Sequence, residues 1–117
     1  MLKVLVVEPK KAPYVKEIDR SLSSFQAEVG GDIEAIFPFD DPVMIICNEE
    51  GKNIGLLLNR AMRDEDGKIW DIISGTFLIV GLGDASLSDE LIDTYSRYFE
   101  TPEVFANVNG QIVVMPL

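Results

Sequence analysis

The sequence predicts an α+β fold with a largely antiparallel sheet of six to eight short strands and two helices. Three observations predict this class. The apolar runs are short and rich in Val, Ile and Leu, and turn signals containing Gly, Pro, Asn or Asp separate most of them. Closely spaced strands are joined by hairpins, which build antiparallel sheets, and only two segments have the apolar spacing of an amphipathic helix. At 117 residues we expect one domain, 1–117.

The first quarter of the chain predicts a hairpin and a helix. Residues 2–7 are rich in Val and Leu, and residues 14–18 alternate apolar and polar side chains, so we expect two strands that pair across a loop with two prolines. Asp19 is the expected N-cap of a helix that ends near Val29, where two glycines stop it. The apolar face of this helix is expected to hold Ile18, Leu22, Phe25 and Val29.

The middle of the chain predicts a set of short strands. Residues 32–37 are expected to form one strand, and the loop 38–42, with a proline at each end, leads to the apolar run 43–47. A continuous apolar run of this length is typical of a strand buried on both faces. Residues 54–58 are its expected partner strand. The acidic segment 64–67 ends in Asp-Gly, which predicts a tight turn.

The following segment predicts two more extended stretches and the second helix. The extended stretches are expected over 68–73 and 76–80, and a loop follows over 81–85. Either Ser86 or Ser88 is expected to cap the helix. Its apolar side chains recur at every fourth position, at Leu87, Leu91, Tyr95 and Phe99.

Asn109-Gly110 is the strongest hairpin signal in the chain, because Asn-Gly suits a two-residue turn between antiparallel strands. We expect the flanking strands over 104–108 and 112–115. The segment from Gln111 to Pro116 would leave an open sheet edge that is able to pair with a second copy across a two-fold axis, so a homodimer is one expectation.

The charge of the chain is strongly negative and uneven. Twenty acidic and ten basic residues give a net charge of −10, to which residues 1–20 contribute +2 and residues 21–117 contribute −12. Such a chain repels phosphate backbones and anionic membranes, so neither nucleic acid nor a membrane is an expected partner. The acidic surface either keeps the protein soluble or imitates nucleic acid and occupies a DNA-binding enzyme. Its candidate residues are Asp40, Asp41, Glu49, Glu50, Asp64, Glu65 and Asp66.

Asn59, Arg60 and Arg63 form the candidate site for a ligand or a partner. They place two of the five basic residues that follow residue 20 beside an amide side chain. Guanidinium groups suit an anion or a partner's carboxylate, and Trp70 is the expected wall of the site, although a single Trp also fits the core. The alternative for the two arginines is local charge pairing with Asp64, Asp66 and Asp71.

The sequence gives little support for an enzyme. It contains no His, and its single cysteine, Cys47, lies in an apolar run where a thiol is expected to have a raised pKa and to be inert. We find no metal or cofactor motif and expect no cofactor. The apolar runs are far shorter than the roughly 18 residues that a membrane helix needs, and no secretory signal opens the chain, so a cytoplasmic location is expected.

Several segments in this order resemble a known family. They are Leu2–Pro9, Pro38–Val43, Cys47–Lys52, Gly55–Asp64, Ser74–Gly81 and Ser86-Leu87-Ser88. Together they are similar to the domain of unknown function 3846 family of small bacterial and phage proteins, in which a proline stands where this chain has Leu57. The resemblance implies no established activity or catalytic residue. It does imply an accessory protein of phages or mobile elements, sometimes encoded near antirestriction genes.

These observations predict a small acidic, non-enzymatic protein-interaction module of the phage or mobile-element type. A DNA mimic with an antirestriction role is the more specific form of this prediction, and a DNA-binding enzyme is then the expected partner. The alternative is a small-molecule or anion-binding domain with its site near Asn59, Arg60 and Arg63.

Overall fold

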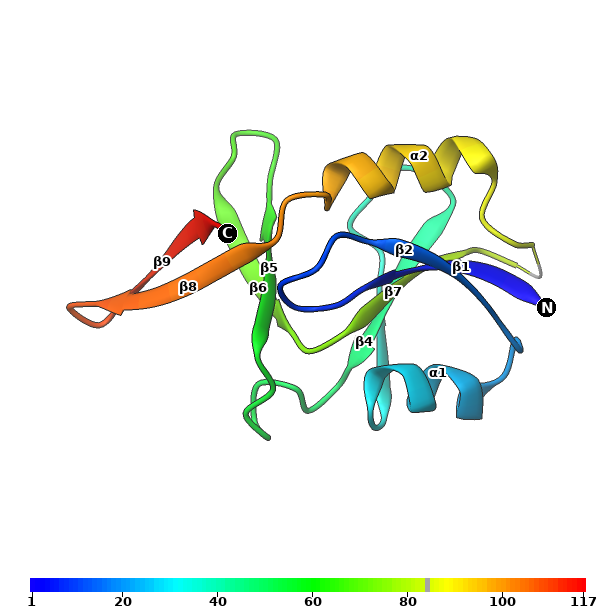
Figure 1. Ribbon diagram of the computed structural model, residues 1–117, viewed down its shortest axis with the longest axis horizontal. Coiled ribbons are helices and arrows are strands. Elements are labelled where there is room, and N and C mark those ends of the chain that lie inside the picture. Colours follow the sequence, from blue (N-terminus) through cyan, green and yellow to red (C-terminus); the bar gives the residue numbers. More distant parts are fainter. Residues whose placement is uncertain (84) are drawn as a thin grey trace.

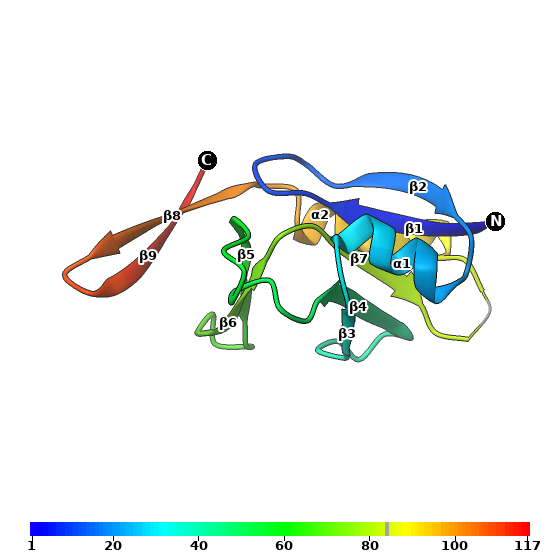
Figure 2. The same ribbon diagram turned by 90° about the horizontal axis from the view of Figure 1, so that it is seen from below.

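A five-stranded antiparallel sheet forms the centre of the molecule, with the strand order β2-β1-β7-β4-β3 (Figure 1). The computed structural model describes residues 1–83 and 85–117, and the strands of this sheet are β1 Leu2–Val7, β2 Tyr14–Ile18, β3 Ile33–Ile36, β4 Val43–Asn48 and β7 Phe77–Gly81. Helix α1 (Leu22–Val29) covers one face of the sheet and α2 (Asp89–Tyr98) covers the other (Figures 1 and 2). The predicted α+β class is confirmed, and the described residues form nine strands rather than six to eight.

Two ribbons of two strands each extend the molecule beyond the central sheet. The β5–β6 ribbon joins β5 (Leu58–Arg63) to β6 (Ile69–Ser74), and the second ribbon, which we call the arm, joins β8 (Glu103–Val108) to β9 (Gln111–Pro116). The arm turns at Asn109-Gly110, as predicted, with φ angles of 52° and 82° that Asn and Gly tolerate best. It projects from the body along the longest dimension of the molecule, which measures 46 Å (Figures 1 and 2).

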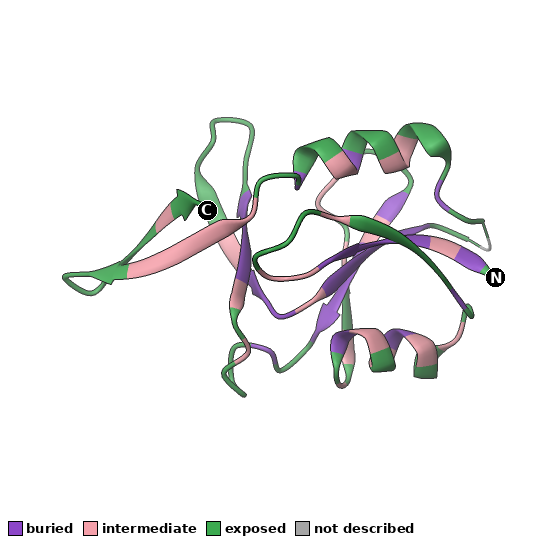
Figure 3. Ribbon diagram, viewed as in Figure 1, coloured by how far each residue is buried: buried purple, intermediate pink, exposed green. Residues whose placement is uncertain are grey.

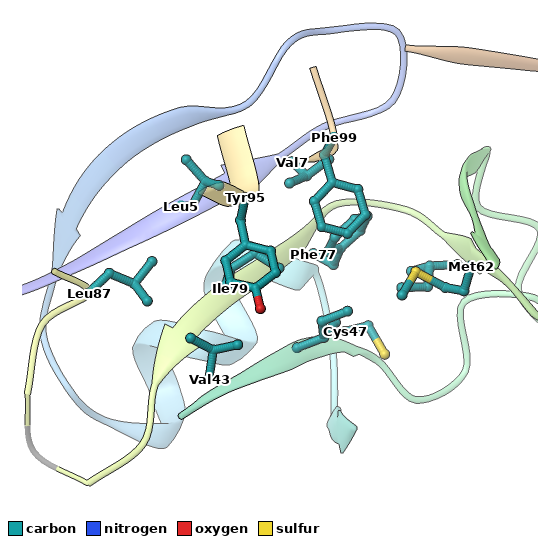
Figure 4. Packing of buried hydrophobic residues seen from close by; sticks show 12 residues of the cluster. Leu5, Val7, Val43, Cys47, Met62, Phe77, Ile79, Leu87, Tyr95 and Phe99 are labelled. Carbon is teal, nitrogen blue, oxygen red and sulfur yellow. The ribbon is translucent and has the colours of Figure 1, made fainter. Parts of the chain in front are cut away.

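Apolar side chains of the central strands fill both faces of the sheet. Leu5, Ile79 and Ile45 lie opposite one another on β1, β7 and β4, and all three are completely buried beneath α2. On the same face the rings of Phe77 and Phe99 pack edge to face, with their centroids 5.3 Å apart (Figure 4). The cluster beneath α1 consists of Leu2, Val4, Val6, Ile18, Phe25, Val29, Ile46, Leu78 and Val80. Because side chains alternate along a strand, the short Val- and Leu-rich runs supply both clusters at once.

Helix α1 begins two residues later than predicted. Ser21, not Asp19, is the N-cap, and its hydroxyl accepts the backbone N–H three residues later. The reason is that β2 continues through Ile18, so the chain must turn before a helix can start. Leu22 is consequently 58% exposed rather than part of the apolar face. The predicted end is confirmed, because Gly30 adopts the left-handed conformation.

Two predicted strands differ from the structure. Residues 54–58 do not pair with β4, because both edges of β4 are already occupied by β3 and β7. They form turns that lead into β5, which begins at Leu58. The predicted strand 32–37 is shorter at both ends, and Phe37, which is 63% exposed, lies outside it.

Helix α2 matches its prediction. Ser88 is the N-cap, and its hydroxyl accepts the N–H of Leu91 at 3.2 Å. Three of the four predicted apolar positions are buried, namely Leu87, Tyr95 and Phe99. The predicted loop 81–85 includes Asp84, which lies outside the described residues.

Candidate functional site

Arg60 lies at the junction between the body and the β5–β6 ribbon and is 2% exposed. Its Nε and Nη2 atoms donate to the carbonyl oxygen of Phe99 at 3.2 and 2.9 Å, and Nη2 also donates to the carbonyl of Lys11 at 2.7 Å. Its Nη1 atom donates to the Oδ1 atom and the carbonyl of Asn59 at 2.8 and 3.3 Å. One guanidinium therefore ties the end of α2 and the β1–β2 loop to β5.

Asn59 extends the same junction to the central sheet. The side chain is completely buried, and its Nδ2 atom donates to the carbonyls of Val7 and Gly75 at 2.9 and 2.8 Å. These two carbonyls belong to the end of β1 and to the turn between β6 and β7. The Asn59–Arg60 pair is thus a buried polar junction that joins β5 to the backbone carbonyls of Val7, Lys11, Gly75 and Phe99.

The hydrogen bonds of Arg60 leave no N–H free for an outside anion. A guanidinium has five N–H donors, and five hydrogen bonds to protein oxygens are present. Burial lowers the pKa of Arg60, while the negative charge of Glu103 opposes that shift. The geometry is that of a structural cation stabilised by carbonyl dipoles.

Arg63 forms a different contact from the one predicted. Its Nη2 atom contacts Glu103 Oε2 at 2.8 Å, and Glu103 Oε1 accepts the N–H of Ala61 at 2.9 Å. The predicted local pairing with aspartates is not what the structure shows: Arg63 pairs with Glu103, and Asp71 forms an ion pair with Lys52. Glu103 therefore attaches the base of the arm to β5 through one ion pair and one backbone hydrogen bond.

Two further aspartates of the predicted pairing belong to the β5–β6 turn. Asp64 Oδ1 accepts the backbone N–H groups of Asp66 and Lys68, both at 2.9 Å, so that carboxylate stabilises its own turn. Asp66 lies exposed in the same turn. The Asp-Gly turn signal therefore predicts the role of these aspartates, whereas the nearby arginines do not.

Trp70 is an exposed side chain of β6 and not a core residue, since 51% of its surface is accessible. It lines two surface cavities. One, of about 440 Å³, also contains Arg63 and the turn 64–66. The other, of about 350 Å³, contains Ile69 and Ile112 of the arm. Trp70 thus lies between the acidic turn and the arm. The structure brings it together with Arg63 at the surface, whereas Asn59 and Arg60 are buried in the interior.

The seven candidate acidic residues are all exposed, but they divide between two ends of the molecule. Five lie on the β3–β4 loop and the β5–β6 turn: Asp40, Asp41, Asp64, Glu65 and Asp66. Pro38 of that loop lines the cavity beside the turn, and Tyr95 of α2 donates its hydroxyl to Asp41 at 2.7 Å, so loop, turn and helix share one end (Figure 1). Glu49 and Glu50 follow the opposite end of β4, a strand length of roughly 17 Å away.

The arm exposes an apolar face. From the register of β8 and β9, one side of the arm carries Val104, Ala106, Val108, Gln111, Val113 and Met115. We call this side the apolar face, since Gln111 is its one polar member. Val108, Val113 and Met115 are 50%, 39% and 43% exposed, in contrast with the buried strands of the body (Figure 3). The other side of the arm turns toward the β5–β6 ribbon, where Glu103 makes the contacts described above and Ile112 lines the cavity beside Trp70.

A smaller cavity lies between β4 and β6. It measures about 190 Å³ and is lined by Cys47, Ser74, Lys52 and Asp71 among others. Burial, and then the charge of Glu34, raises the pKa of the Cys47 thiol to about 11, as the apolar run predicted. The Ser74 hydroxyl is buried and has no hydrogen-bond partner among the described residues.

The sequence does not predict the roles of Glu103 and Ser74, nor that the arm exposes an apolar face. Glu103 is 40 residues from Arg63, so no local spacing could indicate the pair. The arm did carry a signal: residues 104–117 contain no charged side chain in a chain of net charge −10. An uncharged segment in so acidic a chain could have pointed to a contact surface.

The fold and these contacts define a small α+β protein with a buried polar junction and an exposed, uncharged arm. The chain belongs to the family described as Domain of unknown function (DUF3846), which matches residues 2–100. The resemblance seen in the sequence is therefore confirmed, and the arm strands lie beyond the matched range. Comparison of the chain with curated proteins and with solved structures gives no match.

The described part of the chain holds neither a membrane-spanning helix nor a cluster of metal-ligating side chains. No helix in residues 1–83 or 85–117 is long and apolar enough to cross a membrane. Within the same residues, no group of three or more His, Cys, Asp or Glu side chains is arranged to hold a metal ion.

Proposed function

We propose that this protein is a non-enzymatic interaction module that binds another protein through its arm. The observation that carries the proposal is the apolar face, whose Val108, Val113 and Met115 are exposed on a ribbon that projects from the body (Figure 2). Exposed apolar surface of this kind marks interaction sites, because leaving it in water costs free energy that a partner recovers.

The surroundings of the arm favour the same function. Ile69, Trp70 and Ile112 are each 40% or more exposed and line one cavity between the β5–β6 ribbon and the arm. Trp is enriched among residues that dominate binding energy in protein interfaces. These three residues lie on the side of the arm opposite the apolar face, so a partner that wraps around the arm would also meet an aromatic anchor.

Capture from a native lysate tests this proposal. We would compare the tagged wild-type chain with Val113→Glu, on the apolar face, and with Val15→Glu as the matched control. Val15 is also an exposed strand valine, 45% accessible on β2, and its replacement adds the same charge. We expect a protein that is captured by the wild type and by the control but is lost with Val113→Glu. A partner retained equally by all three chains would contradict the arm as the contact.

The acidic end of the molecule supports a second candidate, a DNA mimic that occupies a DNA-binding enzyme. Five of the seven candidate carboxylates lie on the adjoining β3–β4 loop and β5–β6 turn. A mimic of nucleic acid needs such a concentration of negative charge, and its binding should weaken steeply with salt.

Charge neutralisation at the two ends separates this candidate from the first. We would compare Asp64→Asn/Glu65→Gln/Asp66→Asn with Glu49→Gln/Glu50→Gln, which lies at the opposite end. For a mimic, the first variant should release a DNA-binding enzyme at lower salt, whereas the second should behave as the wild type. Equal behaviour of both variants would count against mimicry.

The small-molecule or anion-binding alternative near Asn59, Arg60 and Arg63 stays a prediction with less support, because Arg60 directs its donors to protein oxygens. A cytoplasmic location and a phage or mobile-element setting are further parts of the proposal. They fit an accessory protein that acts by binding.

A further inference from the structure

We infer that the partner of the apolar face is a second copy of this chain, and that two arms pack face to face across a two-fold axis. This inference rests on the proposed function, because it uses the same surface. It goes further by naming the partner and the geometry. Charge, shape and edge chemistry each restrict which surface can cover the arm.

Charge restricts where two copies can meet. Residues 1–103 carry the entire net charge of −10, and residues 104–117 carry none. Two acidic bodies repel each other when they approach closely, but beyond a Debye length of about 8 Å at physiological salt the repulsion is largely screened. The arm projects from the body along its longest dimension, so contact at the arm keeps the bodies apart (Figure 2).

The composition of the apolar face suits an identical surface. A partner with charged recognition groups would find nothing on this face to pair with, since Gln111 at the tip is its one polar side chain. A second uncharged apolar ribbon would bury these side chains without burying an unpaired charge. A two-fold contact uses one patch on both copies, and this patch is complementary to itself because it is apolar throughout its centre.

Packing of the faces explains the arm better than pairing of its edges. Edge-to-edge pairing of β9 with its copy would add hydrogen bonds but would leave Val108, Val113 and Met115 in water. Face-to-face packing, at the roughly 10 Å spacing of stacked sheets, removes them from water. It also supports a two-stranded ribbon, which is marginally stable when it stands alone.

Analytical ultracentrifugation of the purified full chain, from about 1 μM to about 1 mM, tests the inference. We expect a reversible monomer–dimer equilibrium whose association strengthens when NaCl rises from about 50 to about 500 mM, because salt screens the repulsion between the bodies. Val113→Glu should weaken association about 100-fold or more, since each dimer would bury two like charges. Val15→Glu should leave it within about two-fold.

A second variant distinguishes loss of the dimer contact from unfolding of the arm. Val113→Thr keeps the shape and the strand propensity of valine but adds a hydroxyl to the contact. It should weaken the dimer while leaving the amide chemical shifts of the body unchanged. In a mixture of labelled and unlabelled wild-type chains, intermolecular NOEs should connect the methyl groups of Val108, Val113 and Met115, as face-to-face packing requires.

Three outcomes would overturn the inference: a monomer throughout the concentration range, a dimer insensitive to Val113→Glu, or intermolecular NOEs that report a different surface. A monomer that still captures another protein through Val113 would overturn self-association and leave the proposed function standing. A monomer that captures nothing through Val113 would overturn both.

Discussion

The central sheet and the arm are built from the same kinds of residue, yet they use them differently. On β7, Phe77 and Ile79 are completely buried, whereas Val113 on β9 is 39% exposed and Ile112 is 52% exposed (Figure 3). Apolar side chains in the body stabilise the fold from within. Several of those on the arm stay exposed in the single chain, and under the proposed function they contact a partner. Under the proposed function, apolar strands of this small protein stabilise the fold in the body and bind a partner in the arm.

The two regions are also attached differently. The body is joined to the β5–β6 ribbon by the buried hydrogen bonds of the Asn59–Arg60 pair. The base of the arm is attached by Glu103, through its contacts with Ala61 and Arg63. A buried polar junction fixes one region rigidly, whereas a partly exposed ion pair contributes little to stability.

The largest expected effect comes from truncating the same kind of side chain in both regions. Phe77→Ala should lower the free energy of unfolding by about 3–5 kcal/mol, because it leaves a cavity in the core beneath α2. Val113→Ala should lower it by less than about 1 kcal/mol for the monomer, because its side chain is already exposed. Urea denaturation at low protein concentration measures both. Equal losses would contradict the division into core and contact surface.

The junction gives the next largest effect. Arg60→Met should lower the free energy of unfolding by about 3 kcal/mol or more, because the buried carbonyls of Phe99 and Lys11 would lose a charged donor. The matched control is Arg63→Met, which removes a partly exposed ion pair and should cost about 1 kcal/mol or less. Urea denaturation followed by far-ultraviolet circular dichroism checks both. A small loss for Arg60→Met would mean that the junction is not structural.

A smaller, pH-dependent effect is expected at Tyr95. Burial, and then the hydrogen bond to Asp41, raises the pKa of the Tyr95 phenol above its ordinary value of 10. The protonated phenol is therefore favoured in the folded state, so its contribution to stability is complete below pH 10 and is lost as the pH rises above 10. Tyr95→Phe should cost about 1–2 kcal/mol at neutral pH.

The pH profile distinguishes this prediction from a packing effect. The stability difference between the wild type and Tyr95→Phe should shrink as the pH rises above 10, since only the wild type then loses its hydroxyl contact. Tyr98→Phe, on the exposed side of the same helix, is the control and should follow the wild type. A difference that stays constant with pH would argue against the Tyr95–Asp41 bond as its source.

Elements with a local chemical signal could be predicted from the sequence. Asn109-Gly110 specifies its turn because both residues tolerate positive φ angles. Ser88 and the apolar spacing after it specify α2. The N-cap of α1 shows the limit of such signals: Asp19 and Ser21 are both good caps, and the length of β2 selects between them.

The candidate site could be predicted only in part. The sequence predicts Asn59 and Arg60 as residues of a ligand or partner site, but their buried positions depend on backbone carbonyls up to 52 residues away. Every residue offers a carbonyl, so the sequence carries no signal for such partners. The order of the sheet was likewise not predictable, because β7 is inserted between β1 and β4 from a distant part of the chain. The uncharged arm was visible in the sequence, whereas its projection from the body is a property of the fold.

Ser74 provides the smallest expected effect and a test of how complete the polar network of the body is. Its buried hydroxyl lacks a partner among the described residues and lines the cavity of about 190 Å³ between β4 and β6. Removing an unsatisfied buried group relieves its desolvation cost, so Ser74→Ala should raise the free energy of unfolding by up to about 1 kcal/mol. Ser88→Ala, which removes a hydroxyl that caps α2, should instead lower it by about 1 kcal/mol. Opposite signs in the two alanine variants would show that the body tolerates one unpaired hydroxyl. A loss at both positions would mean that Ser74 is hydrogen-bonded in solution by a molecule held in that cavity.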